Sequence, residues 1–402
     1  MIKSKVLKVV LSIFCLILGA AVGAVGCLFY TSPDSYEIPK AISSKGNVVV
    51  GDIDVNVVKQ EDLSIHFLEL GNKYTGDCTL IKVGDVEMLI DAGSKASSIP
   101  QIKSYLDNYV EGDLDYVVVT HAHEDHYAGF ATSENVDNLF DYYEVENIID
   151  FGTGTNKTVT DDGKKNMFEN YIDNRNDEIA SGATYMPVQS FFETGGNERR
   201  FELKSGTGVY VEILYQKFYD KVKNPSDCTA ETENDYSVCL QIVYDEKYYL
   251  FTGDLEAEGE ESLVEENEAG GKNAGMLHQV ALYKAGHHGS KTSSTETLMN
   301  VIKPDVVCVC CCAGSSEYTS KNANQFPTQE FVNNVYSSNP NAKIYVTTLC
   351  IDYKKNEFTS FNGNIVVCAN AGKANNYYFS NTNTELKNTD WFKANRTLPS
   401  AA

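Results

Sequence analysis

A group of histidines directly after a hydrophobic strand is the feature that most constrains this chain. The run Y-V-V-V-T, ending at Thr120, has the composition of a buried strand, and H-A-H-E-D-H follows it without a break. In an extended chain His121 and His123 point in the same direction. A turn then brings Asp125 and His126 to the same point. Imidazole and carboxylate are ligands for Zn, Mn or Fe, so the sequence predicts a metal site at the end of a strand.

The first 30 residues differ in character from the rest of the chain. An apolar run from Val6 to Tyr30 contains no acidic residue, and its only charged neighbours are lysines near its start. The run is long enough to cross a bilayer, and the lysines favour a cytoplasmic N-terminus. We therefore expect residues 1–30 to form a single-pass anchor in the cell membrane, with an extracellular C-terminal domain. Small residues near its end, with a weak lipoprotein box at Ala24–Cys27, leave a secreted or lipid-anchored protein as the alternatives.

The amino-acid composition restricts which partners the protein can bind. The 402 residues include 33 basic and 56 acidic side chains, giving a net charge of -23, and 42 % are hydrophobic. Such an acidic body repels polyanions at long range, which makes DNA binding unfavourable. Lys284, Lys291 and Lys321 are interpreted as scattered surface lysines, with a local basic patch as the alternative. The cysteines at 308–312 lie in a strand-like run and are expected to be small core residues.

Strand and helix patterns alternate through the middle of the chain. The short β-type runs 64–70, 78–83 and 87–90 are separated by turns, and a helical pattern covers 98–109. A polar segment at 152–200, with one helix near 167–179, is expected to be an insertion over the site. The alternation predicts layered α/β packing.

Four further motifs accompany the histidine segment, and together they resemble the metallo-β-lactamase superfamily. In chain order they are G-D-C-T-L-I (76–81), L-I-D-A-G (89–93), F-T-G-D-L (251–255) and K-A-G-H-H-G-S-K-T-S (284–293). The first and last are similar to ComEC-like hydrolase domains, and the late histidine pair is also similar to teichoic-acid phosphorylcholine esterases. The resemblance covers roughly residues 62–370. It implies a four-layer αββα sandwich with a two-metal site between the sheets.

The resemblance also implies roles for individual residues. One metal is held by His121 and His123, and the second by Asp125, His126 and a late histidine. Asp254 bridges the two metals, and Asp91 supports the histidine loop through hydrogen bonds. We favour His288 as the late ligand and place His287 beside the leaving group or a phosphoryl oxygen, with the reverse order open. Ser290 either orients the loop or binds substrate. The catalytic residues are Asp125, Asp254 and His287.

Two positions depart from the family pattern. No histidine lies between His126 and His278, and Tyr215 stands where relatives often have one. We therefore expect the first metal to be weakly held, completed by Tyr215 or water, or to be absent. The second departure is Phe326-Pro327, where ComEC-like relatives often have His-Pro. Of the remaining histidines, His66 is expected to be structural and His278 to be exposed.

The predicted protein is an exported metal-dependent hydrolase that cleaves a phosphodiester with a metal-bound hydroxide. Its cofactors are two divalent ions, with Zn favoured and Mn or Fe as alternatives. The expected substrate is a small-molecule or cell-envelope phosphodiester, and no obligate protein partner is inferred. A β-lactam, ester or amide hydrolase and an inactive surface binding protein are the alternatives. The predicted parts are an anchor (1–30), a tether with a first strand (31–60), the hydrolase domain (61–370) and a C-terminal tail (371–402).

Overall fold

A computed structural model describes residues 46–133, 136–152, 166–221 and 233–400. The predicted membrane anchor at 1–30 and most of the tether lie outside the described residues. Among the residues that are described, no helix combines the length and apolar character needed to cross a bilayer.

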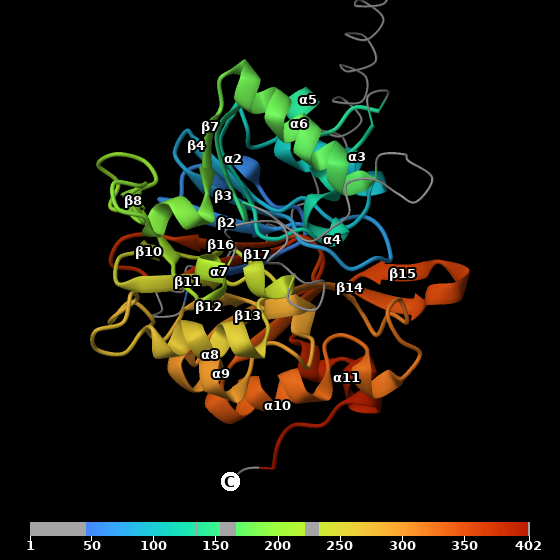
Figure 1. Ribbon diagram of the computed structural model, residues 1–402. Coiled ribbons are helices and arrows are strands. Elements are labelled where there is room, and N and C mark those ends of the chain that lie inside the picture. Colours follow the sequence, from blue (N-terminus) through green and yellow to red (C-terminus); the bar gives the residue numbers. More distant parts are fainter. Residues whose placement is uncertain (1–45, 134–135, 153–165, 222–232, 401–402) are drawn as a thin grey trace, which may run out of the picture. The chain divides into compact units, whose positions relative to one another are not determined.

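Two β-sheets form the centre of the described chain (Figure 1). The first sheet has nine strands in the order β1-β17-β16-β2-β3-β4-β5-β6-β7, and β4 to β7 run parallel. Its strands are β1 (Val48–Val50), β2 (Leu63–Phe67), β3 (Thr79–Val83), β4 (Val86–Ile90), β5 (Leu114–Val119), β6 (Val145–Asp150), β7 (Thr184–Pro187), β16 (Ile365–Ala369) and β17 (Asn376–Phe379).

The second sheet has eight strands in the order β15-β14-β13-β12-β11-β10-β9-β8. Strands β11 to β14 run parallel, and hairpin-type antiparallel pairs extend the sheet on both sides. Its strands are β8 (Arg200–Glu202), β9 (Tyr210–Leu214), β10 (Cys239–Tyr244), β11 (Lys247–Phe251), β12 (Leu282–Lys284), β13 (Val306–Ala313), β14 (Lys343–Asp352) and β15 (Glu357–Ser360).

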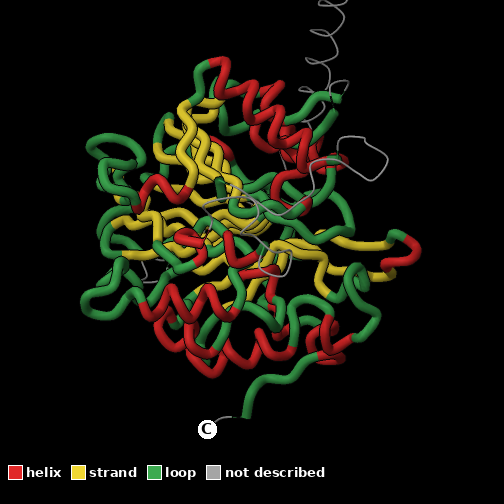
Figure 2. Tube along the Cα trace, viewed as in Figure 1, coloured by secondary structure: helices red, strands yellow, loops and turns green. Residues whose placement is uncertain are grey.

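Helices cover the outer face of each sheet (Figures 1 and 2). The first sheet carries α2 (Val55–Val58), α3 (Ile99–Leu106), α5 (Leu139–Tyr142) and α6 (Met167–Ser181). The second carries α8 (Ala257–Glu265), α9 (Glu296–Ile302), α10 (Gln329–Ser338) and α11 (Asp390–Asn395). Two single-turn helices, α4 (Glu124–Tyr127) and α7 (Phe218–Lys221), follow strands on the side of the site described below.

Three hydrophobic cores separate these layers. In β2 the alternate residues Leu63, Ile65 and Phe67 enter the core between the sheets, because successive side chains of a strand point to opposite faces. A second core lies under α3 and α6, and a third lies under α8 to α11. The predicted four-layer αββα arrangement is thereby confirmed for the described chain.

Two predicted boundaries are corrected by the structure. The described part of the predicted tail at 371–402, up to residue 400, belongs to the fold, because β17 pairs with β1 and β16, and Leu386 and Phe392 are buried in the third core. The described part of the predicted insertion at 152–200 contains α6 and β7, which form a crossover that extends the first sheet beside β6. A polar composition concealed the edge strand β7 and the strand β17, whereas the helix predicted near 167–179 is present as α6.

The cysteines are core residues, as predicted. All eight cysteines in the described residues are free, and seven of them are buried. In β13 they alternate between faces, with Cys308 and Cys310 in the core between the sheets and Cys311 in the outer core.

Candidate metal centre

The predicted site residues follow the carboxyl ends of four strands. Asp91 follows β4, the histidine segment follows β5, Asp254 follows β11 and the late histidine pair follows β12. The pairs β4–β5 and β11–β12 are parallel, so each pair ends at one edge of its sheet. The site therefore combines groups from both sheets.

In the first sheet, a carboxylate orients His126. Asp91 accepts hydrogen bonds from the backbone N and the Oγ1 of Thr120, each at 2.8 Å. Its Oδ2 also lies 2.8 Å from Nδ1 of His126. This contact directs His126 Nε2 toward the second sheet, as the resemblance implies for Asp91. Burial disfavours a charged His126, but the carboxylates of Asp254 and Asp91 overcome it and raise the pKa of His126 to about 10.

The other two histidines of the segment lie beside His126. Nε2 of His121 lies 3.0 Å from Nδ1 of His123, and the rings of His121 and His126 are 4.1 Å apart. Burial and the neighbouring imidazoles hold the pKa of His121 well below its usual range. His121 is therefore neutral at physiological pH, which is the form that binds a metal.

From the second sheet, Asp254 and His288 face His126. Asp254 Oδ2 lies 3.3 Å from Nε2 of His126 and 3.3 Å from Nε2 of His288. The Nδ1 of His288 is 3.0 Å from the carbonyl oxygen of Cys310, which fixes the proton on that nitrogen. Burial opposes ionisation of Asp254, yet the imidazoles of His288 and His126 hold its pKa well below the usual range.

His287 occupies a different place from His288. Its side chain is 22 % exposed, against 1 % for His288. Nδ1 of His287 lies 3.0 Å from Thr292 Oγ1 and 3.2 Å from Glu256 Oε1, while Nε2 is 3.9 Å from Asp254 Oδ2. His288 thus occupies the inner position of the pair and His287 the solvent side, while the choice of His288 as the metal ligand stays a prediction.

The residues fit a divalent cation. Asp77, His126, Asp254 and His288 are buried, and one ligand atom from each lies within 4.8 Å of the others. Within the described chain, one side-chain atom of each of these residues has no hydrogen-bond partner. These atoms are His126 Nε2, His288 Nε2, Asp254 Oδ1 and Asp77 Oδ1. Buried polar atoms without partners are rare and costly, and these imidazole and carboxylate atoms are the donors that zinc and similar cations take.

The remaining predicted residues lie around this group. Asp125 Oδ2 is 3.5 Å from His288 Nε2 and accepts a hydrogen bond of 2.9 Å from the Tyr318 hydroxyl. Tyr215, one of the alternatives for completing the first metal's shell, has other partners. Its hydroxyl donates to Asp220, and its ring lies 3.4 Å from Nζ of Lys272.

Two residues of the site were missed. Asp77 lies in the G-D-C-T-L-I motif, which indicated a similarity to ComEC-like hydrolase domains but no role for this aspartate. Lys284 was interpreted as a surface residue, but its side chain is only 4 % exposed. The signal that could have found it is its place in β12, next to the late histidines and inside a parallel sheet, where both faces are covered.

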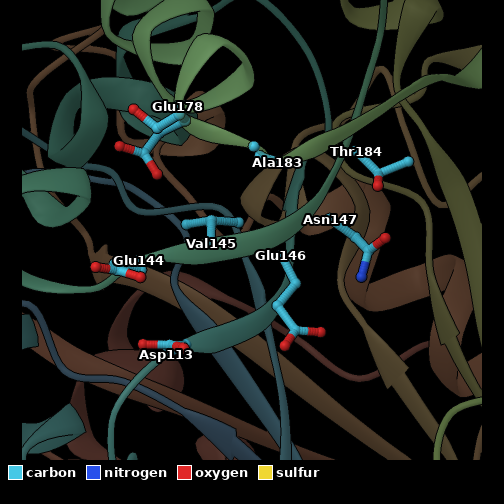
Figure 3. A pocket seen from close by; sticks show the side chains of 10 residues that line it. Asp113, Glu144, Val145, Glu146, Asn147, Glu178, Ala183 and Thr184 are labelled. Carbon is cyan, nitrogen blue, oxygen red and sulfur yellow. The ribbon is translucent and has the colours of Figure 1, made fainter.

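A cavity that opens to solvent lies away from this site. Its volume is about 690 Å³, and it opens at the amino ends of β5, β6 and β7, whereas the histidines follow a carboxyl end. Figure 3 shows the carboxylates of Asp113, Glu144, Glu146 and Glu178 around it. This acidic lining is unsuited to an anionic substrate.

Comparison with known protein sequences agrees with the metal site that the geometry indicates. Residues 71–136 match the profile of the Metallo-beta-lactamase superfamily. The competence protein ComA of Neisseria gonorrhoeae is 32 % identical over 160 residues, which are 39 % of this chain and 19 % of that protein. Recombination protein 2 of Haemophilus influenzae is 31 % identical over 96 residues, which are 24 % of this chain and 11 % of that protein. The chain thus matches less than a fifth of the length of either relative.

Among solved structures, the metallo-beta-lactamase fold protein YhfI from Bacillus subtilis is similar. The match has a TM-score of 0.39 and 10 % identity, and covers 71 % of this chain and 96 % of YhfI.

Proposed function

We infer that this chain belongs to the metallo-β-lactamase superfamily, and we propose that it is a hydrolase that cleaves a phosphodiester with divalent cations as cofactors. The observation that carries the proposal is that His126, Asp254 and His288 each have a buried ligand atom without a hydrogen-bond partner, and that these residues lie close together. The adjoining pair His121 and His123 offers a second place for a cation. Zinc is the favoured ion, and manganese or iron is the alternative.

The residues of the site have separate roles in such a reaction. Divalent cations held here would lower the pKa of water and polarise a phosphoryl oxygen. Asp254 lies between His126 of the first sheet and His288 of the second, so its one carboxylate is close to the ligand groups from both sheets. His287 presents Nε2 from the solvent side, while Thr292 and Glu256 hold its Nδ1. It is therefore placed to stabilise charge on a phosphoryl oxygen or to give a proton to the leaving group.

The first cation is proposed to be the weaker one. His121 and His123 meet at 3.0 Å beside His126, but Tyr215 is engaged with Asp220 and adds no ligand. His126, His288 and Asp254 would hold the second cation, with Asp125 beside His288.

The substrate and location are proposed from charge and sequence. The late H-H-G-S motif and the absence of a histidine between His126 and His278 favour a phosphodiester over a β-lactam. The net charge of -23 argues against a nucleic-acid polymer, so we propose a small-molecule or cell-envelope phosphodiester. The apolar N-terminal run supports a membrane-tethered protein with its catalytic domain outside the cell. The proposal requires no protein partner.

The test measures metal content and turnover of the full-length chain, purified in detergent. The assays use bis-p-nitrophenyl phosphate, p-nitrophenyl phosphorylcholine and nitrocefin, with added Zn or Mn. We expect up to two cations per chain and phosphodiester turnover. Asp254→Asn should reduce kcat/KM by about 100-fold or more, because it removes the carboxylate shared by both halves. Asp85→Asn, on an exposed hairpin turn, is the matched control.

Three outcomes are informative. Hydrolysis of nitrocefin alone would replace the phosphodiester with a β-lactam. Absence of both bound metal and turnover would indicate an inactive binding protein. Equal loss in Asp254→Asn and Asp85→Asn would show that Asp254 has no special part in catalysis.

A further inference from the structure

A buried ion pair lies directly beneath the metal centre and joins the two sheets. Lys284 ends β12 of the second sheet, and Asp77 precedes β3 of the first. The Lys284 ammonium contacts Asp77 Oδ2, and both side chains are only 4 % exposed. The same ammonium lies 3.4 Å from the carbonyl oxygen of Gly253 and 3.7 Å from Asp254 Oδ1. Burying a charge is costly unless it is paired, so Lys284 and Asp77 each depend on the other.

The other oxygen of Asp77 faces the late histidine. Oδ1 lies 3.2 Å from Nδ1 of His288, the nitrogen that also lies 3.0 Å from the Cys310 carbonyl oxygen. Two acceptors at one nitrogen require Nδ1 to carry the proton, which leaves the Nε2 lone pair directed at Asp254 and the metal position. The Asp77 backbone is fixed as well, because its N donates to the carbonyl of Asp125 and its carbonyl accepts from Gly93.

Asp77 contacts His288 in the same way as Asp91 contacts His126 on the other side of the centre. Asp91 contacts Nδ1 of His126, and Asp77 contacts Nδ1 of His288. The two histidines then present their Nε2 atoms to Asp254 from opposite sheets at equal distances of 3.3 Å. One carboxylate oxygen of Asp77 is contacted by Lys284, and the other lies 3.2 Å from Nδ1 of His288.

We propose that Asp77 is a positioning residue that orients His288, and that Lys284 holds Asp77 in this role and prevents it from acting as a metal ligand. The inference rests on the proposed function, because it assigns parts to residues beneath that same centre. It divides the four clustered residues into ligands, namely His126, Asp254 and His288, and one orienting carboxylate.

The test uses three variants of the full-length chain: Lys284→Met, Asp77→Asn and the double variant. Lys291→Met, which removes an exposed lysine from the same loop, is the matched control. The readouts are the melting temperature of the protein freed of metal by a chelator, the cation stoichiometry, and the zinc affinity in competition with a chelator. None of these readouts depends on turnover.

Lys284→Met should lower the melting temperature by about 5 °C or more, because it leaves Asp77 buried without its counter-charge. The double variant should regain most of that loss. Asp77→Asn should keep the stoichiometry but weaken zinc affinity about 10- to 100-fold, as substitutions of orienting partners do. The double variant should retain this weakened affinity in spite of its recovered stability.

Each part of the proposal can be overturned separately. Loss of a whole cation in Asp77→Asn would make Asp77 a ligand. Recovery of both stability and zinc affinity in the double variant would make the pair purely structural. If Lys284→Met behaves like Lys291→Met, Lys284 does not hold Asp77. Should the wild type bind no metal, the proposed function fails, while the melting temperatures still test the ion pair.

Discussion

The histidines of this chain differ in the partners of their ring nitrogens. His126 and His288 contact carboxylates, whereas His66 in β2 contacts the Tyr105 hydroxyl and the Ser64 hydroxyl, each at 2.8 Å. His66 is fully buried, and burial together with nearby Lys82 lowers its pKa to about 3. It therefore stays neutral in the folded protein and serves the packing of the sheet, as the sequence predicted.

The depressed pKa of His66 predicts acid sensitivity. The unfolded chain protonates this histidine below pH 6.5, while the folded chain does so only near pH 3. Acidification between these values therefore lowers the free energy of unfolding by about 1.4 kcal/mol per pH unit. From pH 6.5 to 5.0 this single group accounts for a loss of about 2 kcal/mol, and His66→Gln should remove that part.

Urea unfolding at the two pH values measures this effect. His278→Gln is the control, because His278 is exposed and should leave the pH dependence of the wild type unchanged. An unchanged pH dependence in His66→Gln would assign the acid sensitivity to other groups.

At the scale of elements, α8 anchors the loop that carries the late histidines. Glu260 is buried on this helix and accepts hydrogen bonds from the backbone N of Ser294 at 2.6 Å and of Thr295 at 2.7 Å. It also accepts one of 3.0 Å from Ser293 Oγ. Thr295 is the N-cap of α9, so one carboxylate fixes both the end of the loop and the start of the next helix.

Glu260→Ala should lower the free energy of unfolding by about 2–4 kcal/mol, because it leaves buried donors of this loop without an acceptor. Chemical denaturation compares it with Glu261→Ala, which removes an exposed carboxylate from the same helix. Equal stability of the two variants would show that the loop is held by other contacts.

Elements with a regular pattern were predictable, and those that depend on distant partners were not. The helices α3 and α6 lie where their sequence patterns placed them. Strand β17 is rich in Asn and Tyr and follows a polar turn, and only its pairing with β1 and β16 makes it a strand. Lys284 and Asp77 are separated by more than 200 residues, so no local pattern could indicate that they meet.

At the scale of the whole described chain, the C-terminal segment supports the rim of the site. Arg396 is buried, and its guanidinium donates to the carbonyl oxygens of Pro327 at 2.8 Å, Gln325 at 2.7 Å and Asn322 at 3.1 Å. These carbonyls flank Phe326, whose ring lies 5.7 Å from that of His287 and 6.2 Å from that of His288. A segment at the end of the chain thus fixes an aromatic wall beside the centre.

Arg396→Met should loosen this wall and leave the metal ligands in place. We expect KM for bis-p-nitrophenyl phosphate to rise about 3- to 10-fold, with cation content unchanged, because substrate contacts are weakened more than the reacting groups are. Lys393→Met, on the exposed side of α11, is the control. A fall in cation content would show that Arg396 supports the metal centre itself.

The division of the centre between two sheets also bears on how the chain acquires its cation during synthesis. Asp77 and His126 lie in the first sheet's half of the sequence, whereas Asp254 and His288 are translated more than 120 residues after His126. A ribosome releases the N-terminal half first. That half offers histidines but lacks the late Asp and His, so a nascent chain can retain a cation tightly only after the second sheet has emerged and docked. Tight binding of the ion therefore requires both parts of the centre, one from each sheet.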